Sequence, residues 1–317
     1  MNLQQTFDAA IAMPTILRPS LLQAVRAIFA QDIQGRVQIM LGIDRGPDTH
    51  GILDTLRSEC PSHMAITVID PGYSTARRNG GLYVNNYGGA MRTALSYLAN
   101  SRHVAFLDDD NWWGPSHLSA LLRAIQGKAY AFSLRTLVDG RTDEVICRDE
   151  WESIGPGKGV YNKGFGGWID TSCLMVDKLA CHDALPGWAL SVADSGTGDD
   201  RMVFERLKGK PVGETGEYTA FYRIVLDGLH PYLLWNYKKA GVDLSRFVSP
   251  EHMPPEAVWE QCAAHDRNEA AARQRAAGGA ATVATAATST TAPAGAPQAP
   301  PRTAYASSQV VFSYPKR

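Results

Sequence analysis

The sequence is short of cysteine, of net charge and of long apolar runs, and each shortage argues against a class of protein. Its five cysteines are scattered and form no Cys-x-x-Cys pair, which argues against a disulfide framework and a structural zinc site. A formal net charge of -1 offers no bulk attraction to nucleic acid or to an anionic membrane. No run approaches the roughly 18 apolar residues of a membrane span, and the N-terminus lacks the pattern of a signal peptide. We therefore expect a cytoplasmic protein with no transmembrane segment and no nucleic-acid partner.

Glycine-rich phosphate-binding motifs are also missing. No GxGxxG follows the first predicted strand, and no GxxxxGK[ST] occurs anywhere in the chain. Dinucleotide-binding and P-loop proteins depend on such loops to hold phosphates through backbone amides. Their absence argues against both of these protein classes. A protein that binds a nucleotide diphosphate without such a loop can let a metal ion hold the phosphates instead.

The first third of the chain alternates apolar strands with amphipathic helices. Segments 7–14, 37–43 and 65–69 and the run that begins at Val104 predict four strands, with apolar residues at helical spacing between them. The segment 37–43 is apolar on both faces, as a strand buried inside a parallel sheet must be. This alternation predicts an α/β fold around a mostly parallel, doubly wound sheet.

The second half has a different rhythm. Segments 130–138, 144–148, 168–176 and 218–226 predict strands, and a helix is expected from Asp199 to about 209, so this half is expected to be mixed and partly antiparallel. We expect one domain over 1–250, with a nucleotide-binding half over about 1–113 and a second half over about 114–250. A helical or extended linker over 251–267 would follow. Residues 268–317 are dominated by Ala, Thr, Pro and Gly, which predicts disorder.

Polar residues gather where the predicted parallel strands end, which is where ligands bind in such sheets. Thr15 and Asp44 follow two of these strands, and Asp108, Asp109 and Asp110 follow a third. Three adjacent carboxylates repel one another unless a cation or strong donors hold them, and Asp-x-Asp suits a hard divalent ion. Asp110 would coordinate that ion while a neighbouring aspartate takes a ribose hydroxyl. The alternatives are a solvated acidic turn here and a simple turn-former at Asp44.

A second pair of acids, Asp199 and Asp200, opens a predicted helix. One acid at such a position can act as the helix cap, and the spare carboxylate would then serve as a general base. His230 follows the last predicted strand and could supply a nitrogen ligand to the metal, although a structural role is the alternative. The indole of Trp168 could stack on a sugar ring.

In this order along the chain, these landmarks resemble the nucleotide-sugar glycosyltransferases of the GT-A fold, especially family 2. The resemblance covers about 11–237 and is carried by the segments 11–19, 43–48, 86–90, 105–111, 168–175 and 198–201. It implies a Rossmann-like α/β fold, with a mostly parallel central sheet, helices on both faces and a mixed acceptor-side half from about 114 to 250. The disordered tail would follow this domain.

The resemblance also implies an activity: a metal-dependent, hexosyltransferase-like enzyme that moves a sugar from a nucleotide-diphosphate sugar to an acceptor hydroxyl, with inversion. The donor would be a UDP-sugar above others, and the acceptor a glycan, a lipid-linked molecule or a small molecule. Asp200, with Asp199 as its rival, would be the catalytic base, and Asp110, helped by His230, would bind Mn²⁺ or Mg²⁺. The implied nucleotide-sugar-binding residues are Pro14, Thr15, Arg18, Asp44, Asn86, Asp108 and Asp109, and the acceptor-side residues are Trp168 and Asp170.

Two other functions compete with this interpretation. A nucleotidyltransferase also uses metal-bound acids on an α/β sheet, but the segment 15–20 does not resemble its glycine- and lysine-rich loop. An inactive nucleotide- or glycan-binding domain of the same fold is the second alternative, and the intact acids at both positions count against it. The Gln/Arg-x-x-Arg-Trp motif of processive synthases is absent and no membrane helices follow, which argues against a polysaccharide synthase.

Overall fold

The computed structural model describes residues 6–85, 87–192, 196–268 and 270–271. Its contacts divide the chain into two units, Met1–Val225 and Leu226–Arg317, and each is described here by itself. The break falls earlier than the domain end that the sequence predicts at about 250. The predicted disordered tail lies, from residue 272 onward, outside the described residues.

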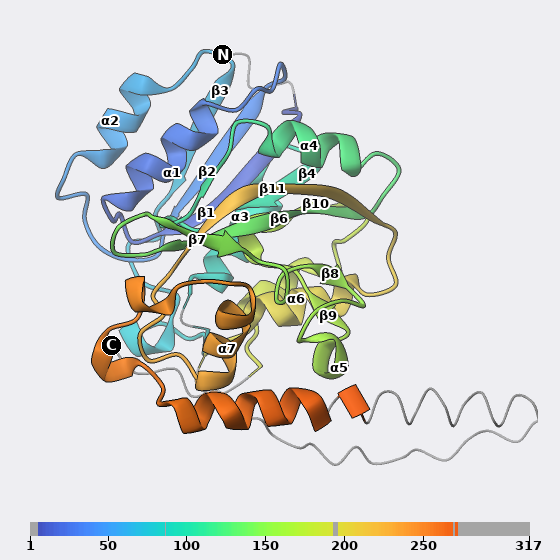
Figure 1. Cartoon of the computed structure of the whole chain (residues 1–317). Coiled ribbons are helices and arrows are strands. Elements are labelled where there is room, and N and C mark those ends of the chain that lie inside the picture. The colour runs from blue at the N-terminus through green and yellow to red at the C-terminus, as the bar shows by residue number, and fades with distance from the viewer. Residues whose placement is uncertain (1–5, 86, 193–195, 269, 272–317) are drawn as a thin grey trace, which may run out of the picture. The chain divides into compact units, whose positions relative to one another are not determined.

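The N-terminal half of the first unit alternates strands and helices as the sequence predicts (Figure 1). Its strands run parallel in the order β3-β2-β1-β4. The elements are β1 (Ala9–Thr15), α1 (Ser20–Phe29), β2 (Val37–Ile43), α2 (Ile52–Glu59), β3 (Met64–Ile69), η1 (Arg77–Asn79), α3 (Gly89–Leu98) and β4 (His103–Phe106). Every residue of β1 and β2 is buried, so these two strands form the centre of the core.

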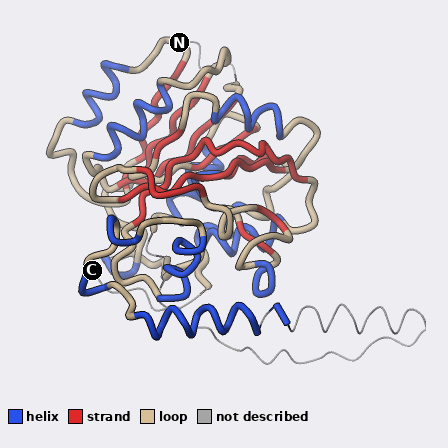
Figure 2. Tube along the Cα trace, in the orientation of Figure 1, coloured by secondary structure: helices blue, strands red, loops and turns tan. Residues whose placement is uncertain are grey.

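The same sheet continues into the second half, where β5, β7 and β10 run antiparallel to the strands beside them. The order continues β4-β10-β6-β11-β5, with β7 paired to β6, and Figure 2 shows the strands side by side in red. Strand β10 is antiparallel to both β4 and β6, whereas β6 and β11 are parallel to each other. The elements are β5 (Trp112–Trp113), α4 (His117–Ala124), β6 (Tyr130–Asp139), β7 (Val145–Arg148), β10 (Leu174–Asp177), η3 (Leu185–Ala189), α6 (Asp199–Leu207) and β11 (Val212–Ile224).

Because β10 is antiparallel to both of its neighbours, β4 and β6 point the same way. The C-terminal ends of β1, β2, β4, β6 and β11 therefore lie at one edge of the sheet. Helix α3 packs on β1 and β2, where Gly42 leaves room for it. A Cβ atom at Gly42 would lie 2.3 Å from Cγ of Met91. The mixed, mostly parallel α/β sheet that the sequence predicts is therefore confirmed.

The single strand predicted over 168–176 is wrong. The chain forms β9 (Gly167–Trp168), then the 3-10 turn η2 (Thr171–Cys173), and only then β10. The cause is Asp170, whose side chain accepts a hydrogen bond of 2.8 Å from the amide of Ser172 and bends the backbone. Strand β9 pairs instead with β8 (Gly155–Pro156), and α5 (Asn162–Phe165) lies between the two in sequence.

The second unit is helical, and one aspartate links its last helix to α7. It contains α7 (Pro231–Lys239), the 3-10 turns η4 (Leu244–Arg246) and η5 (Pro250–His252) and a helix over 256–268. Asp266 accepts hydrogen bonds from Tyr232 (2.7 Å), Trp235 (2.9 Å) and Lys239 (2.7 Å), which ties the last helix to α7. Across the described part of the chain, every helix is too short or too polar to cross a bilayer.

Candidate active site

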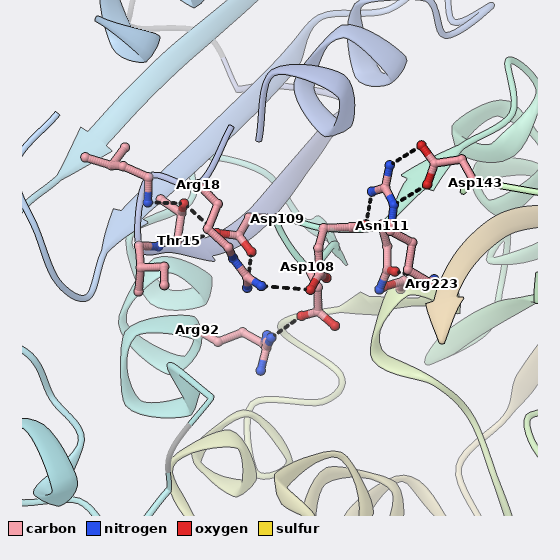
Figure 3. A network of polar contacts seen from close by, with 12 residues as sticks. Thr15, Arg18, Arg92, Asp108, Asp109, Asn111, Asp143 and Arg223 are labelled. Atoms are coloured by element: carbon pink, nitrogen blue, oxygen red, sulfur yellow. Dashed lines mark hydrogen bonds and ion pairs between the residues drawn. The ribbon is translucent and has the colours of Figure 1, made fainter. Parts of the chain in front are cut away.

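The three consecutive aspartates follow β4 at the C-terminal edge of the sheet. Asp109 is 2% exposed, and its carboxylate is held by the loop that follows β1. It accepts hydrogen bonds from the hydroxyl of Thr15 (2.7 Å), the amide of Ile16 (3.3 Å) and the guanidinium of Arg18 (2.5 Å). Asp109 therefore fixes the β1 loop against the end of β4 (Figure 3).

Arg18 also reaches the third aspartate. A second nitrogen of its guanidinium donates to Oδ2 of Asp110 at 3.0 Å, so one arginine bridges two neighbouring acids. The side chain of Asp110 is 38% exposed, while that of Asp109 is almost fully enclosed. Burial raises the pKa of Asp110, and the charge of Arg18 opposes that rise. Asp110 is thus the aspartate of this pair that an incoming ligand can reach.

Arg92, on α3, joins this acidic run to the second acidic pair. Its guanidinium donates to Asp108 at 2.6 Å and to Asp199 at 3.0 Å, and its side chain is only 4% exposed. The ring of Trp188 lies 4.9 Å from the guanidinium carbon and covers it. Asp108 and Asp199 are therefore brought to one place by a buried cation (the Asp108 side is drawn in Figure 3).

The two acids that open α6 lie in different surroundings. Asp199 is the first helical residue rather than the cap, which is Gly198, and its carboxylate is paired with Arg92. Asp200 instead accepts hydrogen bonds from Nε1 of Trp168 (3.0 Å) and from the amide of Arg201 (2.7 Å). Burial, followed by the charge of Asp199, raises the pKa of Asp200 to about 7. The pair therefore contains one carboxylate that is bonded to a buried cation and one that is bonded to two neutral donors.

A second buried arginine lies beside this pair. Arg135, in the middle of β6, donates to Asp149 (2.7 Å), Glu152 (2.6 Å) and Asp170 (2.7 Å), and its side chain is 2% exposed. Asp170, predicted to act on the acceptor side, is thus engaged in an ion cluster and in the η2 turn. Trp168, the other predicted acceptor-side residue, stacks on Arg135.

Asp44 also has partners within the protein. It is 5% exposed and accepts hydrogen bonds from the hydroxyl of Ser74 (2.9 Å) and from both the amide (2.8 Å) and the hydroxyl (2.6 Å) of Thr75. It anchors the loop that follows β3 to the end of β2. A role for Asp44 in binding a nucleotide stays a prediction.

Arg223 closes the other side of the acidic run, at the end of β11. Its amide donates to Oδ1 of Asn111 (2.9 Å), and its guanidinium contacts the backbone carbonyl of Asp110 and forms an ion pair with Asp143 (2.6 Å). The guanidinium carbon also lies 4.6 Å from the centre of the Trp112 ring. The segment that carries the acids is therefore clamped on both sides by arginines.

Searches with family models and against curated protein sequences find no match to this chain. Among solved structures, S. aureus TarS superimposes with a TM-score of 0.51 at 10% identity, over 75% of this chain and 40% of TarS. TarS 1-349 in complex with UDP-GlcNAc gives a TM-score of 0.49 at 10% identity, over 75% of this chain and 68% of that one. The chain thus spans about two fifths of the first TarS chain. With this likeness and the sheet order above, the expected fold is confirmed. The fold is of the GT-A type.

Among the described contacts, none joins Pro14 or Asn86, two of the residues predicted to bind the nucleotide sugar, to the acids above. Pro14 is buried within β1 and faces Gly88, where a Cβ atom would lie 2.7 Å away. Asn86 lies outside the described residues. Its neighbour Asn85 is 2% exposed and accepts hydrogen bonds from the amides of Tyr87 and Gly89, at the start of α3.

His230 lies in the second unit, where its ring caps α7. Nδ1 accepts a hydrogen bond of 3.2 Å from the amide of Tyr232. This contact is the structural role that the sequence left open as the alternative. Its part in binding a metal stays a prediction.

A divalent metal in this GT-A site fits a single carboxylate rather than a cage. Within the described ranges, no three His, Cys, Asp or Glu side chains are arranged to hold a metal ion by themselves. Asp109 is fully engaged with Thr15 and Arg18, and Asp108 is paired with Arg92. Asp110 has the most exposed carboxylate of the three, at 38% against 32% for Asp108, and it would share that carboxylate with Arg18, so the remaining oxygens would have to come from diphosphate and water.

The sequence did not single out Arg92, Arg135 or Arg223. Two of them do leave a signal, because a charged residue on an apolar helix face or inside a buried strand must have a partner. Arg92 follows Met91 on the apolar face of α3, and Arg135 interrupts the buried strand β6. What no local pattern reveals is which acids they pair with.

Proposed function

We propose that this chain is a glycosyltransferase that transfers a sugar from a nucleotide-diphosphate sugar to an acceptor hydroxyl, with Asp200 as the base. One observation carries the proposal: Arg92 holds Asp108, at the end of β4, beside Asp199, at the start of α6. The acids expected at the donor end and the acids expected at the acceptor end therefore form a single site. Such a transfer needs charge stabilisation and a base within reach of the same anomeric carbon.

The base is Asp200 rather than Asp199. The carboxylate of Asp199 is 3.0 Å from the guanidinium of Arg92, so one of its oxygens is engaged in a buried ion pair; burial raises the pKa of Asp199 and the charge of Arg92 opposes that rise. Among the described residues the donors to Asp200 are the indole of Trp168 and the amide of Arg201, both neutral, and its pKa of about 7 suits a group that must take a proton near neutral pH. This difference supports Asp200 over Asp199, the residue that the sequence left as its rival.

The donor end supports binding of a charged leaving group. Arg18 lies half exposed over Asp109 and Asp110, and Arg223 reaches the Asp110 backbone from the other side. Asp110 would hold Mn²⁺ or Mg²⁺. When bound, the metal would neutralise the leaving diphosphate. With one base at the opposite end of the site, direct displacement and inversion are expected.

The experiment is a turnover assay with a panel of sugar nucleotides and Mn²⁺, in which released nucleoside diphosphate is measured. UDP-GlcNAc is included because TarS 1-349 is known in complex with it. We expect turnover with at least one donor and a loss of about 10²- to 10⁴-fold in Asp200→Asn, the range that one general base contributes. Because the ionised carboxylate is the base, wild-type activity should rise as the pH increases through about 7.

Asp54→Asn is the matched control, since Asp54 is a surface aspartate whose side chain is 88% exposed. It should retain wild-type turnover. Release of pyrophosphate from a nucleoside triphosphate, without turnover of any sugar nucleotide, would instead establish a nucleotidyltransferase. Binding of a sugar nucleotide without turnover, unchanged in Asp200→Asn, would indicate an inactive binding domain.

A further inference from the structure

The Arg135 cluster is the least expected feature of the first unit. One guanidinium is buried with three acids, Asp149, Glu152 and Asp170, all within 2.7 Å of it. Asp149 is held further by the amides of Glu152 (2.8 Å) and Ser153 (3.0 Å). Burying several charges is costly, and apolar residues often serve stability equally well, so such a cluster calls for a role beyond packing.

The cluster presents a flat, rigid face to an indole. The guanidinium carbon of Arg135 lies 4.9 Å from the ring centre of Trp168 and 4.5 Å from that of Tyr222. Three ion pairs fix the plane of this guanidinium, and cation–π attraction then fixes the plane of the indole stacked on it. The ring of Tyr161 meets the indole edge-on at 5.6 Å. Trp168 is therefore held on more than one side.

The backbone of Trp168 is fixed as well. Trp168 pairs with Gly155 between β9 and β8, and both Gly155 (φ 97°) and Gly167 (φ 100°) adopt a conformation that side chains rarely permit. A Cβ atom at Gly155 would lie 2.4 Å from the ring of Phe132, and one at Gly167 would lie 2.3 Å from the carbonyl oxygen of Gly155. The two glycines allow this close pairing.

The result of this support is that one indole N–H points at one oxygen of Asp200. Nε1 of Trp168 donates to Oδ2 at 3.0 Å, and the amide of Arg201 donates to Oδ1 at 2.7 Å. Each carboxylate oxygen therefore has one donor, which fixes the carboxylate plane and leaves a lone pair on each oxygen free to accept a proton. An oriented carboxylate is what a general base needs.

We propose that Trp168 is a positioning residue: its N–H orients the base Asp200, and the Arg135 cluster exists to hold the indole in place. This inference rests on the proposed function, because it assigns Trp168 a part in that same reaction. Trp168 would thus act through Asp200 and would not need to touch the acceptor.

The test is Trp168→Phe, which keeps an aromatic side chain beside Arg135 and removes the N–H donor together with one of the two fused rings. We expect kcat to fall about tenfold to a hundredfold, as when a hydrogen-bond partner of a functional group is removed, with KM for the sugar nucleotide unchanged. The N–H favours the ionised carboxylate, so its loss should move the acidic limb of the pH–rate profile to higher pH. The other charged groups near Asp200 are Asp199, Arg201 and Asp170, and none of them is altered.

Trp235→Phe is the matched control. It removes the same kind of bond, an indole N–H to a carboxylate at 2.9 Å, from Asp266 in the second unit. It should leave both kcat and the pH profile at wild-type values. Trp168→His, which keeps a ring N–H, should recover part of the lost rate.

Three results would overturn the inference in distinguishable ways. If the wild type turns over a sugar nucleotide and Trp168→Phe keeps both its kcat and its acidic limb, Trp168 does not position the base and the proposed function still stands. If the wild type turns over no sugar nucleotide, the proposed function fails, and the role of Trp168 fails with it. A change in KM alone would place Trp168 in substrate binding instead, which also contradicts the inference.

Discussion

At the scale of single residues, the site is governed by which acid each arginine neutralises. Arg92 forms ion pairs with Asp108 and Asp199, and Arg18 forms ion pairs with Asp109 and Asp110. Of the two acids that open α6, Asp199 is bonded to Arg92, whereas Asp200 accepts from an indole and an amide, and burial followed by the charge of Asp199 raises the pKa of Asp200 to about 7. Two adjacent residues of the same type thereby acquire different chemical properties.

The buried Arg92 supports a stability prediction. Arg92→Met leaves Asp108 and Asp199 partly or wholly buried without their cation, and removing one partner of a buried ion pair costs about 3–5 kcal/mol. We expect the free energy of unfolding, measured in urea, to fall by about that amount. Combining Arg92→Met with Asp199→Asn should recover part of the loss, because one uncompensated charge is removed.

Arg57→Met provides the comparison for this variant. Arg57 forms an ion pair with Asp54 on the surface of α2, with 56% of its side chain exposed, and such pairs contribute about 0–1 kcal/mol. A loss in Arg92→Met no greater than that in Arg57→Met would contradict the importance of the buried pair.

At the scale of elements, the position of α3 decides where Arg92 lies. Helix α3 packs directly on β1 and β2, and Gly42 of β2 permits the close approach. The residues of α3 that fill this space are Met91 and Leu95, which flank Arg92 on the helix. The geometry of the acid site therefore depends on a glycine in the core that has no chemical role.

Gly42→Ala tests this dependence. A Cβ atom would lie 2.3 Å from Cγ of Met91 and 2.9 Å from Cδ1 of Leu95, so the helix or its side chains must move. Overpacking of this kind costs about 1–3 kcal/mol, and we expect a lower midpoint of thermal unfolding. Gly164→Ala, where no atom lies within 4 Å of the new methyl group, should unfold at or above the wild-type temperature. Equal behaviour of the two variants would rule out close packing at Gly42.

At the scale of the whole molecule, the sheet determines which acids could bind a metal and a nucleotide. The GT-A sheet gathers the C-terminal ends of strands from both halves of the first unit at one edge. A single accessible carboxylate at this edge cannot bind a metal tightly alone, because Asp110 is already paired with Arg18. Metal and nucleotide should therefore stabilise the protein together.

Thermal unfolding with ligands measures this coupling, because a ligand that binds the native state raises its stability. We expect Mn²⁺ with a nucleoside diphosphate to raise the unfolding temperature by more than the sum of the two separate shifts. Asp110→Asn should remove the excess, and Arg18→Ala should increase the shift produced by Mn²⁺ alone. Additive shifts in the wild type, with no effect of Asp110→Asn, would contradict a metal at Asp110.

The sequence predicted the fold better than it predicted the environment of each site residue. The alternation of strands and helices was enough to predict the sheet, and the three consecutive aspartates do follow one of its strands, as predicted. The break at Asp170 was missed, because an aspartate that bonds the amide two residues onward overrides the apolar pattern around it. The partners of Asp44 were missed too, since Ser74 and Thr75 lie in a loop with no periodicity.

By itself, the sequence determined the class of fold and placed two acidic segments at the ends of the predicted elements, and it predicted the edge of the sheet at which a ligand would bind. These depend on the periodicity of neighbouring residues, and neighbours in sequence are neighbours in space. Only the tertiary structure decided that Arg92 pairs with Asp199, that Trp168 donates to Asp200 and that Arg135 supports Trp168. Charge pairing and hydrogen bonding depend on contacts between distant segments, and those contacts exist only after the sheet has brought its strands together.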